Sequence, residues 1–300
     1  MNTISIILPF YNSEQFLGAM LASIAQQSER DFELILINDA STDSSLQIAE
    51  QFVQCTADQF KSILISHTQN RGLVYSINEG MKAAKGRYIA LADHDDIWLP
   101  EKLSIQMHVL ETNGKLNACL CDRTLIDENG RTVLQSEYRF RNFKKKEATL
   151  DDVLKRKIRH SSNTFFFRNI GYSELEIPAS FITHDLYLAF VLAKTGNLYY
   201  HHTPLVRYRI HRKNLSANYY YFLTYSFKRF AQVYRSIKER RNLVRDGDLS
   251  IINSMLSHQN HPKRMLDKER KDHTQSELRV YLKKVIKGNL KRILINWGII

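Results

Sequence analysis

Three carboxylates fall within four residues at Asp93-His94-Asp95-Asp96, directly after a short apolar segment. Like charges packed this closely disfavour one another unless a positive charge lies among them. A hard divalent cation would supply that charge, because Mg²⁺ and Mn²⁺ prefer oxygen ligands and Mg²⁺ is usually held by one or two carboxylates plus substrate phosphates. The plainer alternative is a solvated acidic loop in which Asp96 begins a helix, since acids favour a helix start. The cluster alone leaves both interpretations open.

Short apolar segments alternate with helical patterns around this cluster. The predicted strands are Ile4–Leu8, Phe32–Ile37, Ser62–Ser66 and Arg87–Ala92, and a helical pattern follows each of the first three. Such alternation indicates βαβ units and a parallel sheet, in which ligands bind beyond the carboxyl ends of the strands. Asp39 follows the second strand and the acidic cluster follows the fourth, so we expect these acids to converge on one crevice.

Several residues mark the ends of elements. Ser13 is the predicted N-cap of the first helix, and Gly86 is predicted to close the third helix in a left-handed conformation. Asn129-Gly130 predicts the tip of a hairpin. Further along we predict strands at Thr164–Arg168 and Leu198–Arg209, with a helix starting near Thr183 between them.

Four segments resemble the inverting glycosyltransferase family 2 in their order and spacing. They are Ile6–Asn12, Ile37–Asp43, Asn70–Gly72 and Ala92–Trp98. Together with later segments the resemblance covers roughly Ile4 to Asn214, and the combination is highly specific. It implies an α/β protein with the GT-A fold, a Rossmann-like, mostly parallel central sheet flanked by helices. The Asp-Asp-Ile-Trp ending is similar to a bacterial branch that includes many rhamnosyltransferases.

The resemblance implies which residues contact the nucleotide. Pro9 and Tyr11 would line its pocket, and Asp39 would accept a hydrogen bond from the N3–H of uracil or thymine. Arg71 would face the base or the diphosphate. The alternatives are structural, with Asp39 capping a turn together with Ser41 and Arg71 standing in a surface turn.

The acidic cluster would then be the Asp-X-Asp element of the family. Asp93 would hold the ribose side, and Asp95 would bind a Mn²⁺ or Mg²⁺ that bridges both phosphates, while the histidine between them points away. The segment Tyr208–Asn214 is similar to a Tyr-Arg-x-His-x-x-Asn element of the rhamnosyltransferase-like branch. In it His211 would complete the metal shell or contact a phosphate, and Arg209 would neutralise diphosphate charge. A lone histidine is otherwise more often structural.

Inverting transfer needs one carboxylate to take the proton of the attacking hydroxyl, while a metal stabilises the departing diphosphate. In family 2 this base is an aspartate at the start of a helix, and Phe181–Leu186 matches with Asp185 in the base position. The alternative is an acid that only complements the helix dipole. His184 would orient the acceptor or pack, and Asn163 and Thr164 would line the acceptor side.

The charge of the chain is concentrated at its C-terminal end. The net charge is +12, and Tyr219–Ile300 holds 18 Lys and Arg against 7 Asp and Glu. Between Leu278 and Trp297 apolar residues recur at helical spacing with basic residues opposite, which fits the headgroup layer of an anionic membrane. Equally, that apolar face would pack on the catalytic domain or on a second subunit in a homodimer. Nucleic-acid binding is excluded, because no nucleic-acid module is recognisable and the acidic crevice would be unexplained.

Composition and length set the domain organisation. With 43% apolar residues a substantial core is expected. We predict a catalytic domain at 1–218, with a nucleotide-sugar half at 1–98 and an acceptor half at 99–218, and a basic helical region at 219–300. Three cysteines (Cys55, Cys119 and Cys121) are too few for a disulfide framework and indicate reduced thiols. We find no signal peptide and no uncharged stretch of ~20 apolar residues, which predicts a cytoplasmic protein, either free or peripheral on the inner face of the plasma membrane.

These features predict a metal-dependent, inverting glycosyltransferase of bacterial surface polysaccharide synthesis. It would move rhamnose from dTDP, or a sugar from UDP, to a hydroxyl of a glycan or of a polyprenyl-diphosphate-linked acceptor. A nucleotidyltransferase is the nearest enzyme alternative, but it should show a Gly-rich, Arg-containing loop where Pro9–Ser13 has no glycine. A non-catalytic scaffold that binds sugar nucleotides is the remaining alternative.

Overall fold

The computed structural model describes residues 3–155, 157–179, 184–211 and 214. They all lie within a first compact unit, Met1–Val244, and a second unit spans Arg245–Ile300. The basic helical region predicted at 219–300, with its membrane or subunit contacts, lies outside the described residues. Within those that are described, no helix is both long enough and apolar enough to cross a membrane.

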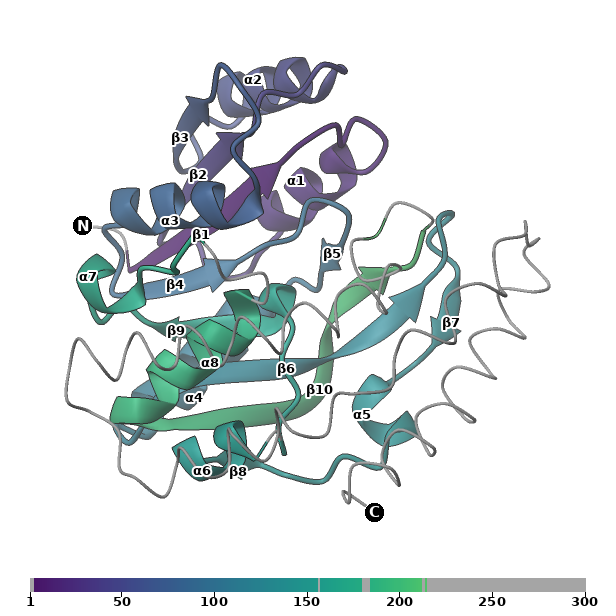
Figure 1. The fold of residues 1–300 in the computed structure, drawn as a ribbon. Helices are drawn as coiled ribbons and strands as arrows, with labels where there is room; N and C mark the ends of the chain where they lie inside the picture. The colour runs from purple at the N-terminus through teal and green to yellow at the C-terminus, as the bar shows by residue number, and fades with distance from the viewer. Residues whose placement is uncertain (1–2, 156, 180–183, 212–213, 215–300) are drawn as a thin grey trace, which may run out of the picture. The chain divides into compact units, whose positions relative to one another are not determined.

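Strands and helices alternate through the first half of the chain (Figure 1). The strands are β1 Ile4–Phe10, β2 Phe32–Asn38, β3 Lys61–Ser66, β4 Tyr88–Leu91, β5 Ile97–Trp98, β6 Leu116–Ile126, β7 Thr132–Leu134, β8 Glu147–Ala148, β9 Phe165–Arg168 and β10 Asn197–Arg209. The helices are α1 Leu17–Ala25, α2 Ser45–Cys55, α3 Leu73–Ala83, α4 Lys102–Thr112, α5 Glu137–Phe140, α6 Leu150–Leu154, α7 Tyr172–Leu175 and α8 His184–Thr195, with a 3₁₀ turn η1 at Ser162–Thr164. The strands predicted from the sequence are confirmed.

The strands form one mixed sheet in the order β3-β2-β1-β4-β9-β6-β10-β5. β1 is parallel to β2 and β4, and β2 is parallel to β3. β9 lies between β4 and β6 and is antiparallel to both, whereas β10 runs parallel to β6. The carboxyl ends of β1, β2 and β4 therefore share one edge, which is where ligands bind in such sheets.

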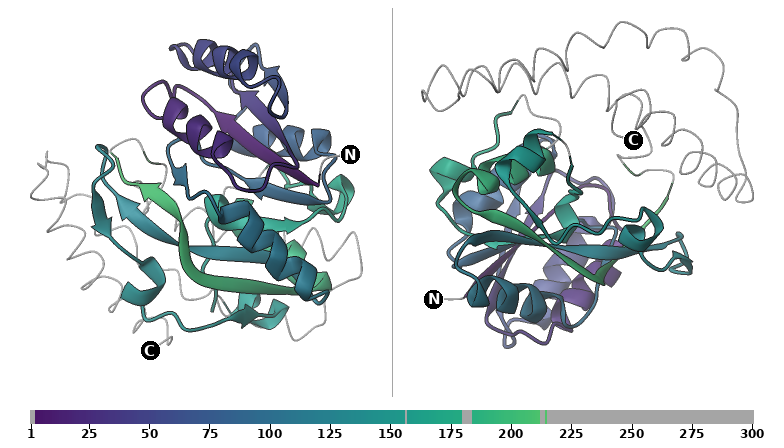
Figure 2. Two further views of the ribbon diagram at one scale, coloured as in Figure 1. Left: turned by 180° about the vertical axis from the view of Figure 1, so that it is seen from behind. Right: turned by 90° about the horizontal axis from the view of Figure 1, so that it is seen from below.

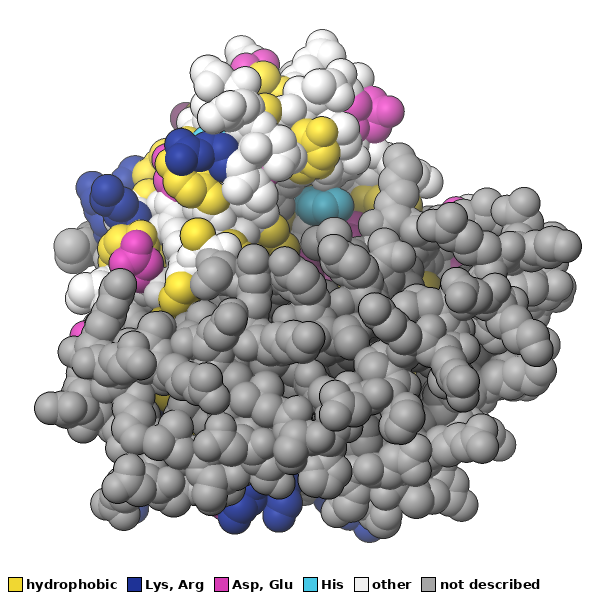
Figure 3. Space-filling view, in the orientation of Figure 1, with side chains coloured by type: hydrophobic (Ala, Val, Ile, Leu, Met, Phe, Trp, Pro, Cys, Tyr) yellow, Lys and Arg dark blue, Asp and Glu magenta, His cyan; other side chains and the backbone are white. Residues whose placement is uncertain are grey.

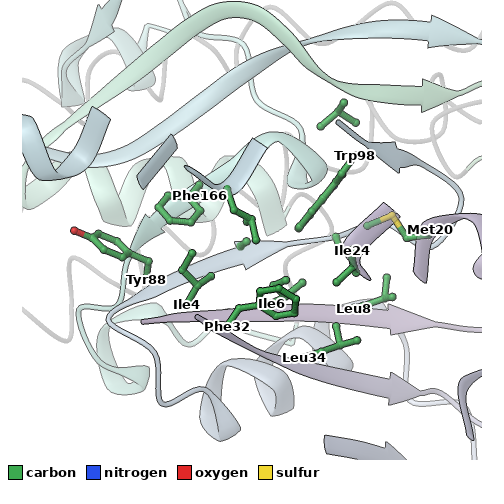
Figure 4. Close-up of a cluster of buried hydrophobic side chains, with 14 of the residues drawn as sticks. Ile4, Ile6, Leu8, Met20, Ile24, Phe32, Leu34, Tyr88, Trp98 and Phe166 are labelled. Atoms are coloured by element: carbon green, nitrogen blue, oxygen red, sulfur yellow. The ribbon is translucent and has the colours of Figure 1, made fainter. Parts of the chain in front are cut away.

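Alternate side chains of the central strands face two helical layers. Ile4, Ile6 and Leu8 of β1 join a buried cluster with residues of α1 and α4 (Figure 4). Ile7 points to the other face, where α3 packs so closely that a Cβ on Gly80 would lie 2.4 Å from Cγ2 of Ile7. Figures 1 and 2 show α3 and α8 on one face of the sheet and α1 and α4 on the other. Burial on both faces explains why most residues of β1 and β2 are apolar.

Two predicted element ends are wrong. α1 begins at Leu17 with Phe16 as its N-cap, because the carbonyl of Ser13 instead closes a turn by accepting from the N–H of Phe16 and Leu17. α3 ends at Ala83, and Gly86 has no left-handed backbone. Gly86 is required by crowding, since a Cβ there would lie 2.6 Å from the backbone nitrogen of Ser5.

Two other local predictions are confirmed. Gly130, with φ of 79°, lies in the turn between the antiparallel strands β6 and β7. Cys119 and Cys121 are free and buried in β6. Burial raises the pKa of the Cys121 thiol to about 11, so this cysteine is an unreactive packing residue.

Candidate active site

The acidic cluster forms the turn between β4 and β5, at the shared edge of the parallel strands. Asp96 is fully buried and accepts hydrogen bonds from the side-chain amide of Asn163 and, at 2.9 Å, from the backbone N–H of Arg209. Burial, and then the charges of Asp95 and Asp93, raise the pKa of Asp96 well above its usual value. Asp96 precedes a strand, so the alternative that it begins a helix is wrong. It ties the turn to η1 and to the end of β10.

Asp95 lies against the end of β10. Its Oδ2 is 2.9 Å from Nε2 of His211 and 3.2 Å from Nδ2 of Asn214. Burial raises the pKa of Asp95, but the hydrogen bond from His211 and the charges of His94 and His211 outweigh it and lower this pKa overall. Asp95 is therefore ionised at neutral pH, and it contacts the histidine that was predicted to share its metal.

Asp95 and His211 fit a cation site that phosphate completes. Nowhere in the described ranges do three or more His, Cys, Asp or Glu side chains form a group that could hold a metal by themselves. An ionised carboxylate beside an imidazole nitrogen supplies two donors, and Mg²⁺ is ordinarily bound through one or two carboxylates together with substrate phosphates. These two residues would hold Mn²⁺ or Mg²⁺ only in combination with a bound diphosphate.

Asp93 connects the acidic turn to the 3₁₀ turn η1. Its two carboxylate oxygens lie 2.9 and 3.1 Å from Oγ of Ser162, which donates to them. Burial, and then the charges of Asp95 and Asp185, raise the pKa of Asp93 to about 7. Asp185 is thus close enough to act electrostatically on Asp93, and Figure 1 shows the start of α8 on the side to which β1 and β4 point. The acids after β4 and the predicted base therefore lie near one another at this edge of the sheet.

Asp185 lies in the first turn of α8. Its Oδ1 accepts the N–H of Leu186 at 2.8 Å, and its Oδ2 is 3.1 Å from Nδ1 of His160. Burial raises the pKa of Asp185, but the charge and hydrogen bonding of His160, and then the charge of His184, lower it to about 2. The carboxylate is therefore ionised at every physiological pH and can accept a proton.

Asp39 holds the turn that leads into α3. Its Oδ1 accepts the N–H of Arg71 and its Oδ2 the N–H of Gly72, both at 2.8 Å. Nδ1 of His67 lies 2.8 Å from Oδ1 of Asp39, and Nε2 of His67 contacts Glu79. Because most acceptor directions of this carboxylate are already used, Asp39 positions the Arg71-Gly72 turn.

The predicted alternative for Asp39 is wrong in its details. The turn at Ser41 is closed by Asn38, whose Oδ1 accepts the N–H of Ser41 at 3.0 Å. Asp39 therefore caps a different segment, one that lies more than thirty residues further along the chain. A structural role for Asp39 is compatible with a nucleotide site, because the turn that Asp39 holds carries Arg71, the predicted nucleotide contact.

The predicted nucleotide-contacting residues surround Asp39. Pro9 is buried in β1 opposite Ile37, whereas Tyr11, just beyond the end of β1, is 44% exposed. The guanidinium of Arg71 lies 3.7 Å from the centre of the Tyr75 ring. An exposed ring and a cation over a second ring are groups on which a nucleotide can stack. Contact of these residues with a nucleotide stays a prediction.

Two of the predicted site residues, Arg209 and Asn163, are engaged within the protein, whereas, within the described ranges, His184 is not. The guanidinium of Arg209 donates to the carbonyls of Asp95 and Glu128, both at 2.9 Å. Asn163 is fully buried on Asp96. Nε2 of His184 is buried and has no hydrogen-bond partner in the described part of the chain, and burial lowers the pKa of His184. Arg209 and Asn163 are thus placed to position the acidic turn.

Sequence reasoning missed His67, His160 and Ser162. His67 follows β3 at the same edge as Asp39, so the rule that ligands gather beyond strand ends would have identified it. His160 and Ser162 belong to the same polar run as Asn163, directly before β9. Their partners lie 25 and 69 residues away in the chain, so no local signal could reveal the pairing.

The surface of this part of the chain is chemically mixed. Figure 3 shows acidic and basic side chains interspersed with uncharged ones around α2 and α3. In the middle of that view a histidine side chain lies beside acidic ones. The visible surface therefore carries both positive and negative side chains.

Comparisons with known proteins point to one family. Residues 5–173 match Glycosyl transferase family 2. The putative glycosyltransferase EpsE of Bacillus subtilis (strain 168) is 37% identical over 127 residues, which are 42% of this chain and 45% of that protein. The putative glycosyltransferase EpsH of the same strain is 29% identical over 226 residues, or 72% of this chain and 63% of that protein. The chain therefore spans less than two thirds of either relative.

Solved structures share the fold. Residues 1–349 of TarS from S. aureus in complex with UDP-GlcNAc align with a TM-score of 0.63 at 20% identity, covering 85% of this chain and 72% of that chain. Mannosyltransferase PcManGT from Pyrobaculum calidifontis, in complex with GDP-Man and Mn²⁺, aligns with a TM-score of 0.60 at 15% identity, covering 99% and 84%. These similarities confirm the predicted GT-A fold. The rhamnosyltransferase-like branch stays a prediction.

The family match extends over more than half of the chain. It includes Asp39, Arg71, the acidic turn and the polar run before β9, which carry most of the residues described above. The chain belongs to glycosyl transferase family 2.

Proposed function

We propose that this chain transfers a sugar from a nucleoside diphosphate carrier to an acceptor hydroxyl, with inversion at the sugar carbon. The observation that carries the proposal is the proximity of three acids, since the charges of Asp95 and Asp185 both act on Asp93. Asp95 and Asp185 have lowered pKa values, whereas burial and its acidic neighbours raise that of Asp93 to about 7. Different environments for neighbouring carboxylates are typical of sites that divide binding and proton transfer between them.

The nucleotide end of the donor would lie between β1 and the turn that Asp39 holds. The N–H groups of Arg71 and Gly72 are used by Asp39, so the Arg71 side chain and the exposed Tyr11 ring are left to face the ligand. A pyrimidine stacked there would leave its diphosphate pointing toward the acidic turn. Asp95 and His211 would hold a Mn²⁺ or Mg²⁺ at that diphosphate, where the cation would stabilise the negative charge of the leaving group.

Asp185 would take the proton of the acceptor hydroxyl. As that oxygen forms its bond to the anomeric carbon, the bond from this carbon to the phosphate oxygen breaks, and the nucleoside diphosphate leaves on the opposite face. The N–H of Leu186 holds the carboxylate by a hydrogen bond, and the ring of His160 lies beside its other oxygen. One in-line displacement inverts the anomeric configuration and leaves no covalent sugar on the protein.

The finer assignments rest on the sequence resemblance and on the ligands of related structures. The donor would be dTDP-rhamnose or a UDP-sugar, and the TarS complex with UDP-GlcNAc supports a uridine carrier. The acceptor would be a glycan, free or carried on a polyprenyl diphosphate, in the synthesis of bacterial surface polysaccharide. The reaction would take place in the cytoplasm, or on the inner face of the plasma membrane if the C-terminal region docks there.

The test is a panel of UDP-, dTDP- and GDP-sugars incubated with the full chain and Mn²⁺. Release of nucleoside diphosphate identifies the donor, and NMR of the released or transferred sugar reports its anomeric configuration. We expect one carrier class to be consumed and the product to have the opposite configuration to the donor. Retention of configuration, or release of pyrophosphate instead of a nucleoside diphosphate, would refute the proposal.

A further inference from the structure

A cavity lies apart from the acidic turn and its partners. It has a volume of about 590 Å³ and opens between the segment after β7 and strand β10. None of its lining residues is among the candidate site residues described above. Its volume is within the range of small-molecule sites.

The cavity has an aromatic wall. The rings of Tyr138 and Phe143 meet edge to face with centroids 4.9 Å apart, and His202 stacks on Phe143 at 6.2 Å. Nε2 of His202 is held by the carbonyl of Lys145 at 2.9 Å. These three rings pack on one another, and the hydrogen bond of His202 holds one of them in place. The wall of the cavity is therefore formed without a ligand.

The charge around this cavity is positive. Residues 137–146 contain five basic side chains and one acid, Glu137. Glu137 is already paired with Arg123 and Arg141, and Lys145 is paired with Asp152 at 2.7 Å.

Two of the remaining cations, Arg139 and Lys144, line the cavity together with the amides of Gln135 and Asn142. Arg139 and Lys144 have no acidic partner in the described ranges, and no described Asp or Glu lines the cavity. The cavity thus presents two uncompensated cations above an aromatic wall.

We infer that this cavity binds a phosphate-bearing anion. The guanidinium of Arg139 offers a fork of N–H donors that matches phosphate oxygens, and Lys144 supplies a second point charge. The amides of Gln135 and Asn142 can add neutral hydrogen bonds. The inference rests on this cavity alone and does not depend on the proposed glycosyl transfer.

Two kinds of ligand carry such a phosphate group, a free diphosphate and an anionic lipid headgroup. Calorimetry with inorganic pyrophosphate in metal-free buffer tests the first, and sedimentation with phosphatidylglycerol vesicles tests the second. The full chain is compared with the Arg139→Gln/Lys144→Gln double variant and with a matched control, Lys82→Gln/Lys115→Gln, which removes two exposed charges elsewhere. Circular dichroism and thermal unfolding confirm that each variant is folded.

A cavity-filling variant separates a built site from diffuse positive charge. Gln135→Trp keeps every cation but fills the cavity from an exposed position. We expect both this variant and the double variant to lose at least about tenfold in affinity for one of the two probes, which is ~1.4 kcal/mol, while the control binds as the unmodified chain does.

If the double variant and Gln135→Trp bind pyrophosphate more weakly, the ligand is a free diphosphate. If they bind the vesicles more weakly, the ligand is a lipid headgroup. Equal binding of both probes by all variants overturns the inference, as does retention of binding by Gln135→Trp. Donor turnover, measured in the same preparations, stays unchanged, so this outcome is independent of the catalytic proposal.

Discussion

Oδ2 of Asp39 accepts the backbone N–H of Gly72 at 2.8 Å and so joins the end of β2 to the residue that precedes α3. Gly72 has φ of 86°, a backbone that side chains rarely adopt. The carboxylate therefore fixes a turn whose geometry depends on glycine. Correct placement of Arg71, the predicted donor contact, depends on this hydrogen bond.

Replacing Asp39 by Asn should loosen that turn. One of the two backbone N–H groups would then face an amide NH₂, so we expect a loss of about 1–3 kcal/mol in the free energy of unfolding and weaker donor binding. Urea unfolding and donor calorimetry measure the two effects. The matched control is Asp58→Asn, an exposed acid, which should change neither. Unaltered stability and donor affinity in Asp39→Asn would refute the positioning role.

His67 should make stability depend on pH. Burial lowers its pKa, but the hydrogen bonds that His67 donates to Asp39 and Glu79, and the charges of these acids, outweigh burial and raise this pKa above the ordinary value of 6.5. Because the folded-state pKa is the higher one, the stabilisation is fully present below about pH 6.5 and is lost as pH rises through the folded pKa. Unfolding measured from pH 5.5 to 8.5 should therefore show a falling stability that His67→Gln removes. An unchanged pH slope in the variant would contradict this.

Asp95 and His211 should govern binding of Mn²⁺ in the presence of nucleoside diphosphate. With one of two protein donors removed, Asp95→Ala or His211→Gln should weaken Mn²⁺ binding at least about tenfold, since such cations rely on few protein ligands. Electron paramagnetic resonance of free Mn²⁺ measures this directly. His108→Gln, an exposed histidine on α4, should bind as the unmodified chain does. Mn²⁺ affinity that survives both substitutions would place the cation elsewhere.

The buried Glu137 should stabilise the fold above its unfolded pKa. Burial raises the pKa of Glu137, but Arg123 and Arg141 outweigh burial and lower it from 4.5 to about 2. Its stabilisation is therefore complete above pH 4.5 and is lost as pH falls toward 2. Glu137→Gln should cost about 3 kcal/mol at pH 7, and clearly less at pH 3, by urea unfolding. Glu111→Gln breaks an exposed pair with Arg87 and should cost only about 0–1 kcal/mol.

The sequence predicted the parallel half of the fold because its signals are local. The apolar segments that became β1 to β4 alternate with helical patterns, and Asp39 and Asp93 follow strands that share one edge. Insertion of β9 between β4 and β6 could not be predicted, since it depends on pairing between segments distant in sequence. Gly86 was misinterpreted for the same reason, because its crowding comes from Ser5.

The candidate site was predictable as a set of residues but not as a set of contacts. The motifs contain Asp95, Asp185, Arg209 and His211, and the structure places Asp95 beside His211. A sequence motif does not predict which groups its side chains contact. Arg209, predicted to neutralise diphosphate charge, donates instead to carbonyl groups of the protein itself. His160 was missed because only the folded chain brings it to Asp185.

The most direct test of the account compares donor affinity and turnover in Asp185→Asn with those of the unmodified chain. The change removes the proton acceptor while keeping its shape, so we predict an unchanged donor Kd and a kcat lower by ~10²–10⁴-fold. The pKa of Asp185 is held at about 2, so turnover by the unmodified chain should not be limited by this group between pH 5 and 8. Asp151→Asn, an exposed acid at the start of α6, serves as the control. Turnover by Asp185→Asn equal to that of the control would contradict the account.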